Sequence, residues 1–316
     1  MLLEQIIGLI LMSQKPNLFV IGAPKCGTTH VVAALSEHPE CFLPYPKETG
    51  FWATDVLRPK SVSDIKTLAQ YEALYDSATP YHSYRIDGSV IYLFSSTAVE
   101  NILKFNEEAK FVVMLRNPVE QVQSWHQEQV FNFNEDVKDF WTAWSLQSER
   151  ARGRHLPPHL TEPARIQYAH YCALGDQLER AVKKIPARNL FIGFLEDIKN
   201  NPGAFYRSLQ AFLGVQIHEI GIGGTVKPAR RHRFSGLAQY YQEPPTALAP
   251  AVRLIKRFLR QPNSKVLPLL KLALTQRTVR NSLSKQHENE LHAVFDAQTE
   301  KIEALTQRDL AHWKRT

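Results

Sequence analysis

A strand, a glycine-bounded turn and a helix near the N-terminus limit the folds open to this chain. Residues 17–22 (Asn-Leu-Phe-Val-Ile-Gly) form a continuous apolar run, which is typical of a parallel strand buried on both faces. A turn between Gly22 and Gly27 follows, and residues 29–35 predict a helix. Glycine lets the backbone approach a ligand closely, and N–H groups at a helix start attract anions, so this unit predicts a phosphate-binding loop.

The rest of the chain alternates short strands with helices. This alternation predicts an α/β fold with a P-loop-type central parallel sheet, helices on both faces and a helical C-terminal extension from about residue 245. We expect an N-terminal extension over residues 1–16 and one domain over 17–316. Further strands are predicted at 41–43, 84–87, 110–116 and 190–194, and helices at 97–105, 119–128, 136–151, 164–184 and 202–213.

The lysine of the turn is displaced from its usual place. The glycines have the spacing of the common nucleotide-binding loop GxxxxGK[ST], but Thr28 stands at the lysine position and Lys25 precedes Gly27. ATP-dependent P-loop enzymes use their lysine with Mg²⁺ on the outer phosphates. The displacement argues against that chemistry, although a P-loop nucleotide kinase remains an alternative.

Residues 24–29, Pro-Lys-Cys-Gly-Thr-Thr, resemble the 5′-phosphosulfate loop of the sulfotransferases that use 3′-phosphoadenosine 5′-phosphosulfate (PAPS), whose pattern is Pro-Lys-x-Gly-Thr-Thr. The resemblance implies PAPS as donor, its 3′,5′-bisphosphate (PAP) as product, and the α/β fold of that family. It also implies donor contacts from Lys25, Cys26, Gly27, Thr28 and Thr29, with Lys25 stabilising charge on the sulfuryl group during transfer.

Two further segments are similar to the family's 3′-phosphate elements. Arg116-Asn117-Pro118 follows the apolar strand at 110–116, and Ser124 lies eight residues after Arg116. Arginine makes a forked, permanently charged contact to phosphate, so this pair suits a second phosphate. The basic segment 227–233 lies where the family places a loop over the nucleotide, which implies roles for Arg230 and Arg233; a solvated basic loop is the alternative.

Lys47-Glu48 with Phe51-Trp52 resembles the Lys-Glu-x-x-Phe-Phe element of the heparan-type and bacterial carbohydrate sulfotransferases. The resemblance implies that Glu48 is the general base, which takes the acceptor proton during an in-line transfer. The aromatic pair is expected to exclude water from this carboxylate. A surface Lys-Glu pair is the alternative interpretation.

Two other segments near the predicted site carry candidate residues. His126 is a rival candidate for the base, although it is expected mainly to pack or to line the pocket. Residues 87–92 resemble the family's acceptor-positioning segment, with Val90 in place of its proline.

Composition bears on partners and location. The formal net charge of +7 fits an anionic ligand but is too scattered to indicate nucleic acid. The apolar residues 6–12 are shorter than the ~20 that a spanning helix needs, so we expect a short docking segment or an extended start, with peripheral membrane contact and a targeting role as alternatives. Three cysteines without a Cys-x-x-Cys pair, and no Asn-x-Ser/Thr acceptor, predict a cytoplasmic protein.

The sequence therefore predicts transfer of a sulfuryl group to a hydroxyl or amine of an acceptor, first a carbohydrate or glycan and second a small alcohol or phenol. We expect no metal, because fixed donors meet the charge of the leaving group. A non-catalytic PAPS- or anion-binding module is the second alternative; Glu48 argues against it, since a module that only binds has no use for a base. The pattern does not predict an oligomeric state.

Overall fold

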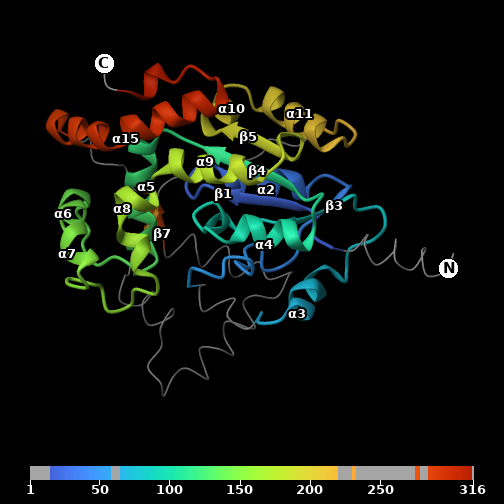
Figure 1. The fold of residues 1–316 in the computed structure, drawn as a ribbon, viewed down its shortest axis with the longest axis horizontal. Coiled ribbons are helices and arrows are strands. Elements are labelled where there is room, and N and C mark those ends of the chain that lie inside the picture. Colours follow the sequence, from blue (N-terminus) through green and yellow to red (C-terminus); the bar gives the residue numbers. More distant parts are fainter. Residues whose placement is uncertain (1–14, 58–64, 220–229, 233–274, 278–283, 315–316) are drawn as a thin grey trace.

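A five-stranded parallel sheet forms the centre of the protein, with strand order β2-β3-β1-β4-β5 (Figure 1). The computed structural model describes residues 15–57, 65–219, 230–232, 275–277 and 284–314. The chain fills one side of β1 first and then the other, which makes β1 the switch point of the sheet, where α/β proteins bind ligands. The strands are β1 (Leu18–Gly22), β2 (Cys41–Phe42), β3 (Tyr84–Asp87), β4 (Lys110–Leu115) and β5 (Leu190–Phe194).

Helices cover both faces of the sheet. α4 and α9 lie side by side in front of the strands in Figure 1, and Arg180 of α9 donates a hydrogen bond to the Phe94 carbonyl near α4 at 3.0 Å. α2 and α11 are joined by His30 and Tyr206, at 2.5 Å. The helices up to residue 213 are α2 (Thr28–Ser36), α3 (Leu68–Glu72), α4 (Ala98–Phe105), α5 (Pro118–Phe131), α6 (Phe140–Ser145), α7 (Gln147–Ala151), α8 (Tyr168–Tyr171), α9 (Leu174–Lys184), α10 (Leu195–Asn200) and α11 (Pro202–Leu213).

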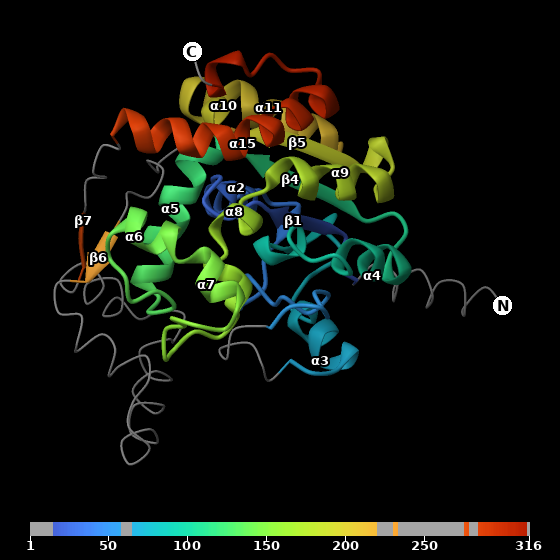
Figure 2. The same cartoon turned by 60° about the vertical axis from the view of Figure 1, so that its left-hand side comes forward.

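Two hydrophobic clusters make up the core. The larger one surrounds the sheet, where residues 18–21 and 111–115 are fully buried, as a parallel sheet covered on both faces requires. The smaller one gathers around Trp125, Tyr168 and Tyr171 on α5 and α8. The long C-terminal helix α15 (Lys285–Thr306) packs against α9 and α5, and Figures 1 and 2 both show it along one edge of the molecule.

The predicted fold class is confirmed, including a helical C-terminal region, but several element boundaries differ. The helices predicted at 136–151 and 164–184 are each broken. Asp139 starts α6 by accepting a hydrogen bond from the Thr142 N–H at 2.8 Å, so the helix begins there and not at residue 136. The second prediction covers the 3₁₀ turn Pro163–Ile166, α8 and α9.

The sequence prediction missed the helices α3 and α10 and the strands β6 and β7. α10 follows β5 directly. β7 (Thr275–Arg277) lies inside the region predicted to be helical and pairs antiparallel with β6 (Arg230–His232). This prediction was wrong at β7 because a short strand depends on a partner far away in the sequence, which local periodicity does not reveal. The basic amphipathic stretch 252–260 lies outside the described residues.

Candidate functional site

The predicted phosphate loop connects β1 to α2 at the carboxyl edge of the sheet. Lys25 and Gly27 both have left-handed backbones, with φ of 65° and 92°. Loops that mix left- and right-handed residues turn successive N–H groups toward one concavity, which suits an anion. α2 adds the N–H groups of its first turn, which have no carbonyl partner within a helix. The local sequence thus builds an anion-binding loop from backbone donors.

The side chains of the loop differ in how far they reach solvent. Cys26 is fully buried, and burial raises the pKa of its thiol to about 12 against the opposing charges of Arg116 and Lys25. The buried thiol is therefore neutral at ordinary pH. Thr28 is buried and Thr29 is exposed at the start of α2. Lys25 is partly exposed.

Arg116 joins the end of β4 to this loop. Its side chain is 10% exposed, and its Nη1 donates a hydrogen bond to the Lys25 carbonyl at 3.3 Å. α5 begins two residues later: Asn117 caps the helix by accepting from the Val119 N–H at 2.9 Å, and Pro118 occupies the first turn. Ser124 is buried on the same helix. The structure therefore brings Lys25, Arg116 and α5 together, as the sequence predicted.

Two glutamates of α5 form ion pairs with Lys25 and Arg116. The sequence analysis did not predict these pairs. Lys25 Nζ forms an ion pair with Glu128 Oε2 at 2.7 Å. Arg116 donates to Glu120 Oε2 from Nε at 3.0 Å and from Nη2 at 2.5 Å. The four-residue spacing of Glu120, Ser124 and Glu128 was the available signal, because such residues share one face of a helix.

The segment that carries Glu48 follows β2 and meets the end of β3. Glu48 forms an ion pair with its neighbour Lys47 at 2.6 Å, and its side chain is 45% exposed. The Lys47 carbonyl accepts a hydrogen bond from the Gly88 N–H at 3.0 Å. Ser89 Oγ accepts from the N–H groups of Thr49 at 2.8 Å and Gly50 at 3.0 Å. The candidate base thus sits on backbone that β3 holds in place.

Asp87, at the end of β3, is the central acceptor of the hydrogen bonds that hold the Glu48 segment on β3. Its carboxylate is fully buried and accepts hydrogen bonds from Ser89 Oγ at 2.5 Å, from the hydroxyls of Tyr71 and Tyr92 at 2.8 Å each, and from Thr49 Oγ1 at 3.0 Å. Burial raises the pKa of Asp87, and the hydrogen bonds act against that rise. Residues 87–92 were expected to position the acceptor. Asp87, Ser89 and Tyr92 are all buried, and their described contacts hold the Glu48 segment; the acceptor-positioning role stays a prediction.

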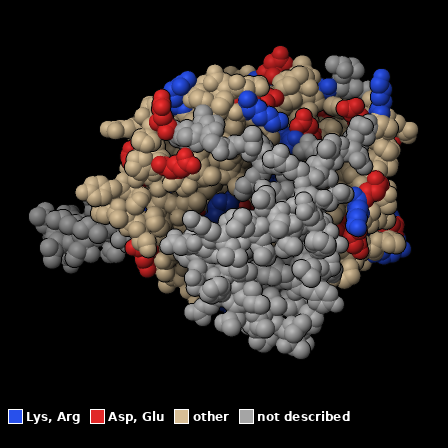
Figure 3. Space-filling model, turned by 180° about the vertical axis from the view of Figure 1, so that it is seen from behind, with Lys and Arg blue, Asp and Glu red and all other residues tan. Residues whose placement is uncertain are grey.

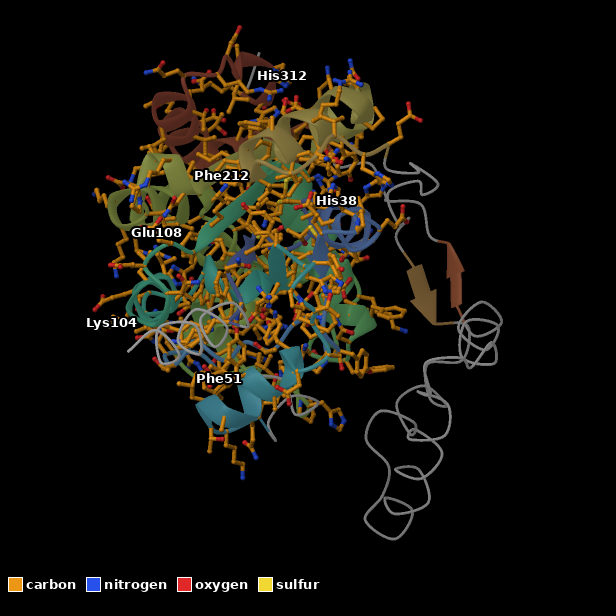
Figure 4. The ribbon with its side chains drawn as sticks, turned by 90° about the vertical axis from the view of Figure 1, so that its right-hand side faces the viewer. His38, Phe51, Lys104, Glu108, Phe212 and His312 are labelled. Carbon is orange, nitrogen blue, oxygen red and sulfur yellow. The ribbon has the colours of Figure 1, made fainter. Side chains whose placement is uncertain are left out.

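The aromatic pair after Glu48 packs against Tyr71 of α3. Phe51 stacks on Tyr71 with ring centroids 4.7 Å apart, and Figure 4 shows it beside α3. Trp52 packs edge-on against the same Tyr71 ring at 5.3 Å. This pair forms part of the support under the segment.

A second aromatic stack joins α5 and α8. Tyr171 stacks between Trp125 at 4.4 Å and Phe94 at 4.5 Å. Burial raises the pKa of Tyr171, the charge of Arg165 opposes the rise, and the charges of Cys172 and Glu48 add to it.

The rival base His126 faces the interior. It is 2% exposed, its Nε2 lies 2.9 Å from the Val137 carbonyl, and it packs edge-on against Phe140 and Tyr168. Burial lowers its pKa, which favours the neutral ring. His126 therefore acts as a packing residue.

Of the remaining predicted donor contacts, Arg230 lies in β6, where only the backbone is described, and Arg233 lies outside the described residues. Among the described residues, no cluster of His, Cys, Asp or Glu has the makings of a metal site, and no helix has the length and apolar character to cross a membrane. On the face shown in Figure 3, Lys and Arg are interspersed with Asp and Glu over the described surface.

The amino-acid sequence matches a known family. The chain matches the sulfotransferase domain family over residues 15–314, and it belongs to that family. It is therefore an enzyme of the transferase class that moves sulfuryl groups. A crystal structure of a sulfotransferase from Alicyclobacillus acidocaldarius shares the fold, with a TM-score of 0.66 and 21% identity over 95% of this chain and 99% of that one.

Other relatives are more distant. The human bifunctional heparan sulfate N-deacetylase/N-sulfotransferase 2 is 22% identical over 205 residues, which are 63% of this chain and 22% of that protein. The chain thus spans about a fifth of that relative's length. A mouse sulfotransferase, SULT7A1 complexed with PAP, has 13% identity and a TM-score of 0.39, covering 76% of this chain and 70% of that one.

Proposed function

We propose that the protein transfers a sulfuryl group from PAPS to a hydroxyl or amine, by in-line attack with Glu48 as the general base. The observation that carries the proposal is the contact of Arg116 Nη1 with the Lys25 carbonyl at 3.3 Å. It joins a loop suited to a 5′-phosphate to an arginine suited to a second phosphate. The 3′-phosphate is what distinguishes PAPS from ATP, so this pair of subsites favours PAPS.

In the proposed reaction, the acceptor oxygen or nitrogen attacks sulfur as Glu48 takes its proton, and the bond from sulfur to the 5′-phosphate oxygen breaks. Lys25 and the loop N–H groups stabilise the negative charge that develops on the leaving PAP. Gly27, Thr28 and Thr29 hold the 5′-phosphate, and Arg116 with Ser124 holds the 3′-phosphate. Arg230 and Arg233 are proposed to close over the nucleotide. These fixed donors supply the charge that a metal supplies elsewhere.

The acceptor is proposed to be a carbohydrate or glycan. The family resemblance of the Glu48 segment supports this choice, as does the identity of 22% over 205 residues to a protein named for heparan sulfate.

A cytoplasmic location is proposed because Cys26, Cys41 and Cys172 are all free and buried thiols. A single domain over residues 17–316 is likewise proposed.

The proposal is tested by measuring PAP binding and sulfuryl transfer from PAPS to a panel of glycans and small alcohols. Lys25→Ala should lower transfer by about 3–4 kcal/mol of transition-state stabilisation, the typical cost of removing one such donor. Glu48→Gln should lower transfer by about 100- to 10,000-fold, while PAP binding changes little. Near-wild-type transfer by either variant would overturn the mechanism.

A matched control comes from α9. Glu179 pairs with Lys183 at 2.8 Å, as Glu48 pairs with Lys47, but on the far side of the sheet from the loop–α2 unit. Glu179→Gln should leave both PAP binding and transfer unchanged. A wild-type protein that binds PAP tightly and sulfates no acceptor would instead support a module that only binds.

A further inference from the structure

One face of α5 carries a hydroxyl group between two carboxylates. Glu120, Ser124 and Glu128 are spaced by four residues, so they line the same face of the helix. Glu120 contacts Arg116, and Glu128 contacts Lys25 at 2.7 Å. Lys25 and Arg116, the two proposed donor contacts whose charged side chains the structure describes, therefore each already have a carboxylate beside them.

α5 is attached to the phosphate loop by a buried hydrogen bond, which would be lost if the helix moved away. Gln121 of α5 is buried and its Nε2 donates to the Pro24 carbonyl at 3.1 Å, which ties the helix to the loop. Glu128 is itself oriented, because its second oxygen accepts from Asn132 Nδ2 at 3.0 Å. The carboxylate of Glu128 thus has a fixed place next to the lysine.

The two pairs differ in what an arriving anion does to them. Arg116 has five N–H donors in a planar fork and uses three described contacts on Glu120 and the Lys25 carbonyl, so it can keep Glu120 and still bind phosphate. Lys25 is a compact charge, and an anion on its ammonium must stand close to the Glu128 carboxylate. Like charges at that distance repel each other.

We infer that Glu128 is a positioning residue that holds Lys25 when the donor is absent and that weakens nucleotide binding by competing for the lysine. The inference rests on the proposed function, since it takes Lys25 as a donor contact. Binding of the nucleotide exchanges one anion on Lys25 for another. Glu128 therefore tunes donor affinity and product release, and Glu120 only orients Arg116.

The test is a double-mutant cycle on PAP binding by the full chain, measured by calorimetry. Glu128→Gln should tighten PAP binding about two- to fivefold, the range expected for a partly exposed ion pair. The same substitution in a Lys25→Ala background should leave PAP affinity unchanged, because the competing pair no longer exists. A purely structural role for Glu128 would not make its effect depend on Lys25.

Controls separate the outcomes. Glu100→Gln removes another 2.7 Å pair, with Lys104 on α4, and should not change PAP affinity. If Glu128→Gln folds poorly, Glu128→Ser takes its place and should tighten PAP binding in the same way. Equal PAP affinities of wild type and Glu128→Gln overturn the inference, as does a large loss of transfer at unchanged affinity. A wild-type protein that fails to bind PAP overturns the proposed function itself.

Discussion

Gly27 shows how much of the loop depends on one residue. Its φ of 92° lies in the left-handed region, and a Cβ atom there would stand 2.8 Å from Leu195 Cδ1 of α10. Both the backbone conformation and the space behind the loop therefore require glycine. α10 thus packs directly behind the phosphate loop.

We expect Gly27→Ala to destabilise the fold by about 2–4 kcal/mol, because the cost of a left-handed alanine adds to that of overpacking. PAP binding should weaken at least tenfold, since the loop must shift. Gly153→Ala is the control: Gly153 has φ of 77° and nothing within 4 Å of its added Cβ. It should cost about 1–2 kcal/mol and leave PAP affinity alone. Urea unfolding and calorimetry measure both effects, and equal costs for the two variants would refute the packing argument.

At the residue scale, the sequence predicted the positions of Lys25, Gly27 and Arg116 because a strand–turn–helix fixes its own loop locally. It did not predict that Glu128 pairs with Lys25, since those residues are 103 positions apart and the contact depends on how β1 and β4 align. The sequence motif thus predicted which residues gather at the loop, and the structure added the carboxylates that hold them.

At the scale of elements, the end of β3 governs the segment that carries Glu48. The fully buried Asp87 carboxylate accepts hydrogen bonds from the hydroxyls of Thr49, Tyr71 and Tyr92. Ser89 Oγ accepts hydrogen bonds from the backbone N–H groups of residues 49 and 50. The strands themselves were predictable from their apolar runs. The hydroxyl network was not, because it joins β3, α3 and the segment after β2 through tertiary contacts.

Asp87→Asn should therefore destabilise the protein by about 1–3 kcal/mol and reduce transfer more than PAP binding. Asparagine offers one acceptor oxygen where the aspartate offers two, so a buried hydroxyl loses its partner. The matched control is Asp55→Asn, since Asp55 also accepts hydrogen bonds, from Ser95, Ser96 and Thr97 just before α4, but is exposed. It should leave transfer unchanged. Equal losses of transfer in both variants would contradict a positioning role.

The same two variants should differ in pH dependence. Burial raises the pKa of Asp87, so its contribution to stability is greatest at low pH and falls as pH rises through the raised pKa. For Asp55, burial acts to raise the pKa, but hydrogen bonds from residues 95–97 together lower it to about 2. Its contribution is present above pH of about 4 and lost as pH falls toward 2. Urea unfolding from pH 3 to 7 should show the stability gap to wild type shrinking with pH for Asp87→Asn and widening for Asp55→Asn.

At the scale of the whole molecule, α15 joins the two hydrophobic clusters. Leu291 and Phe295 are buried in the smaller cluster with Trp125, and Ile302 is buried in the larger one around the sheet. Beyond the helix, Arg308 makes a forked pair with Asp197 of α10, with both contacts at 2.7 Å. The C-terminal part therefore supports both α5, which carries Ser124, and α10, which backs Gly27.

Phe295→Ala tests this coupling. Phe295 is 1% exposed, and truncating a buried phenylalanine costs about 3–5 kcal/mol through lost burial and a residual cavity. Because α15 belongs to both clusters, we expect the variant to lower the unfolding midpoint seen by tryptophan fluorescence and by far-UV circular dichroism by the same amount. The adjacent Val294, which is 42% exposed, provides the control, and Val294→Ala should change stability by less than about 0.5 kcal/mol. If the fluorescence midpoint alone moved, the smaller cluster, where Trp125 and Trp144 lie, would unfold as a separate unit and α15 would not couple it to the sheet.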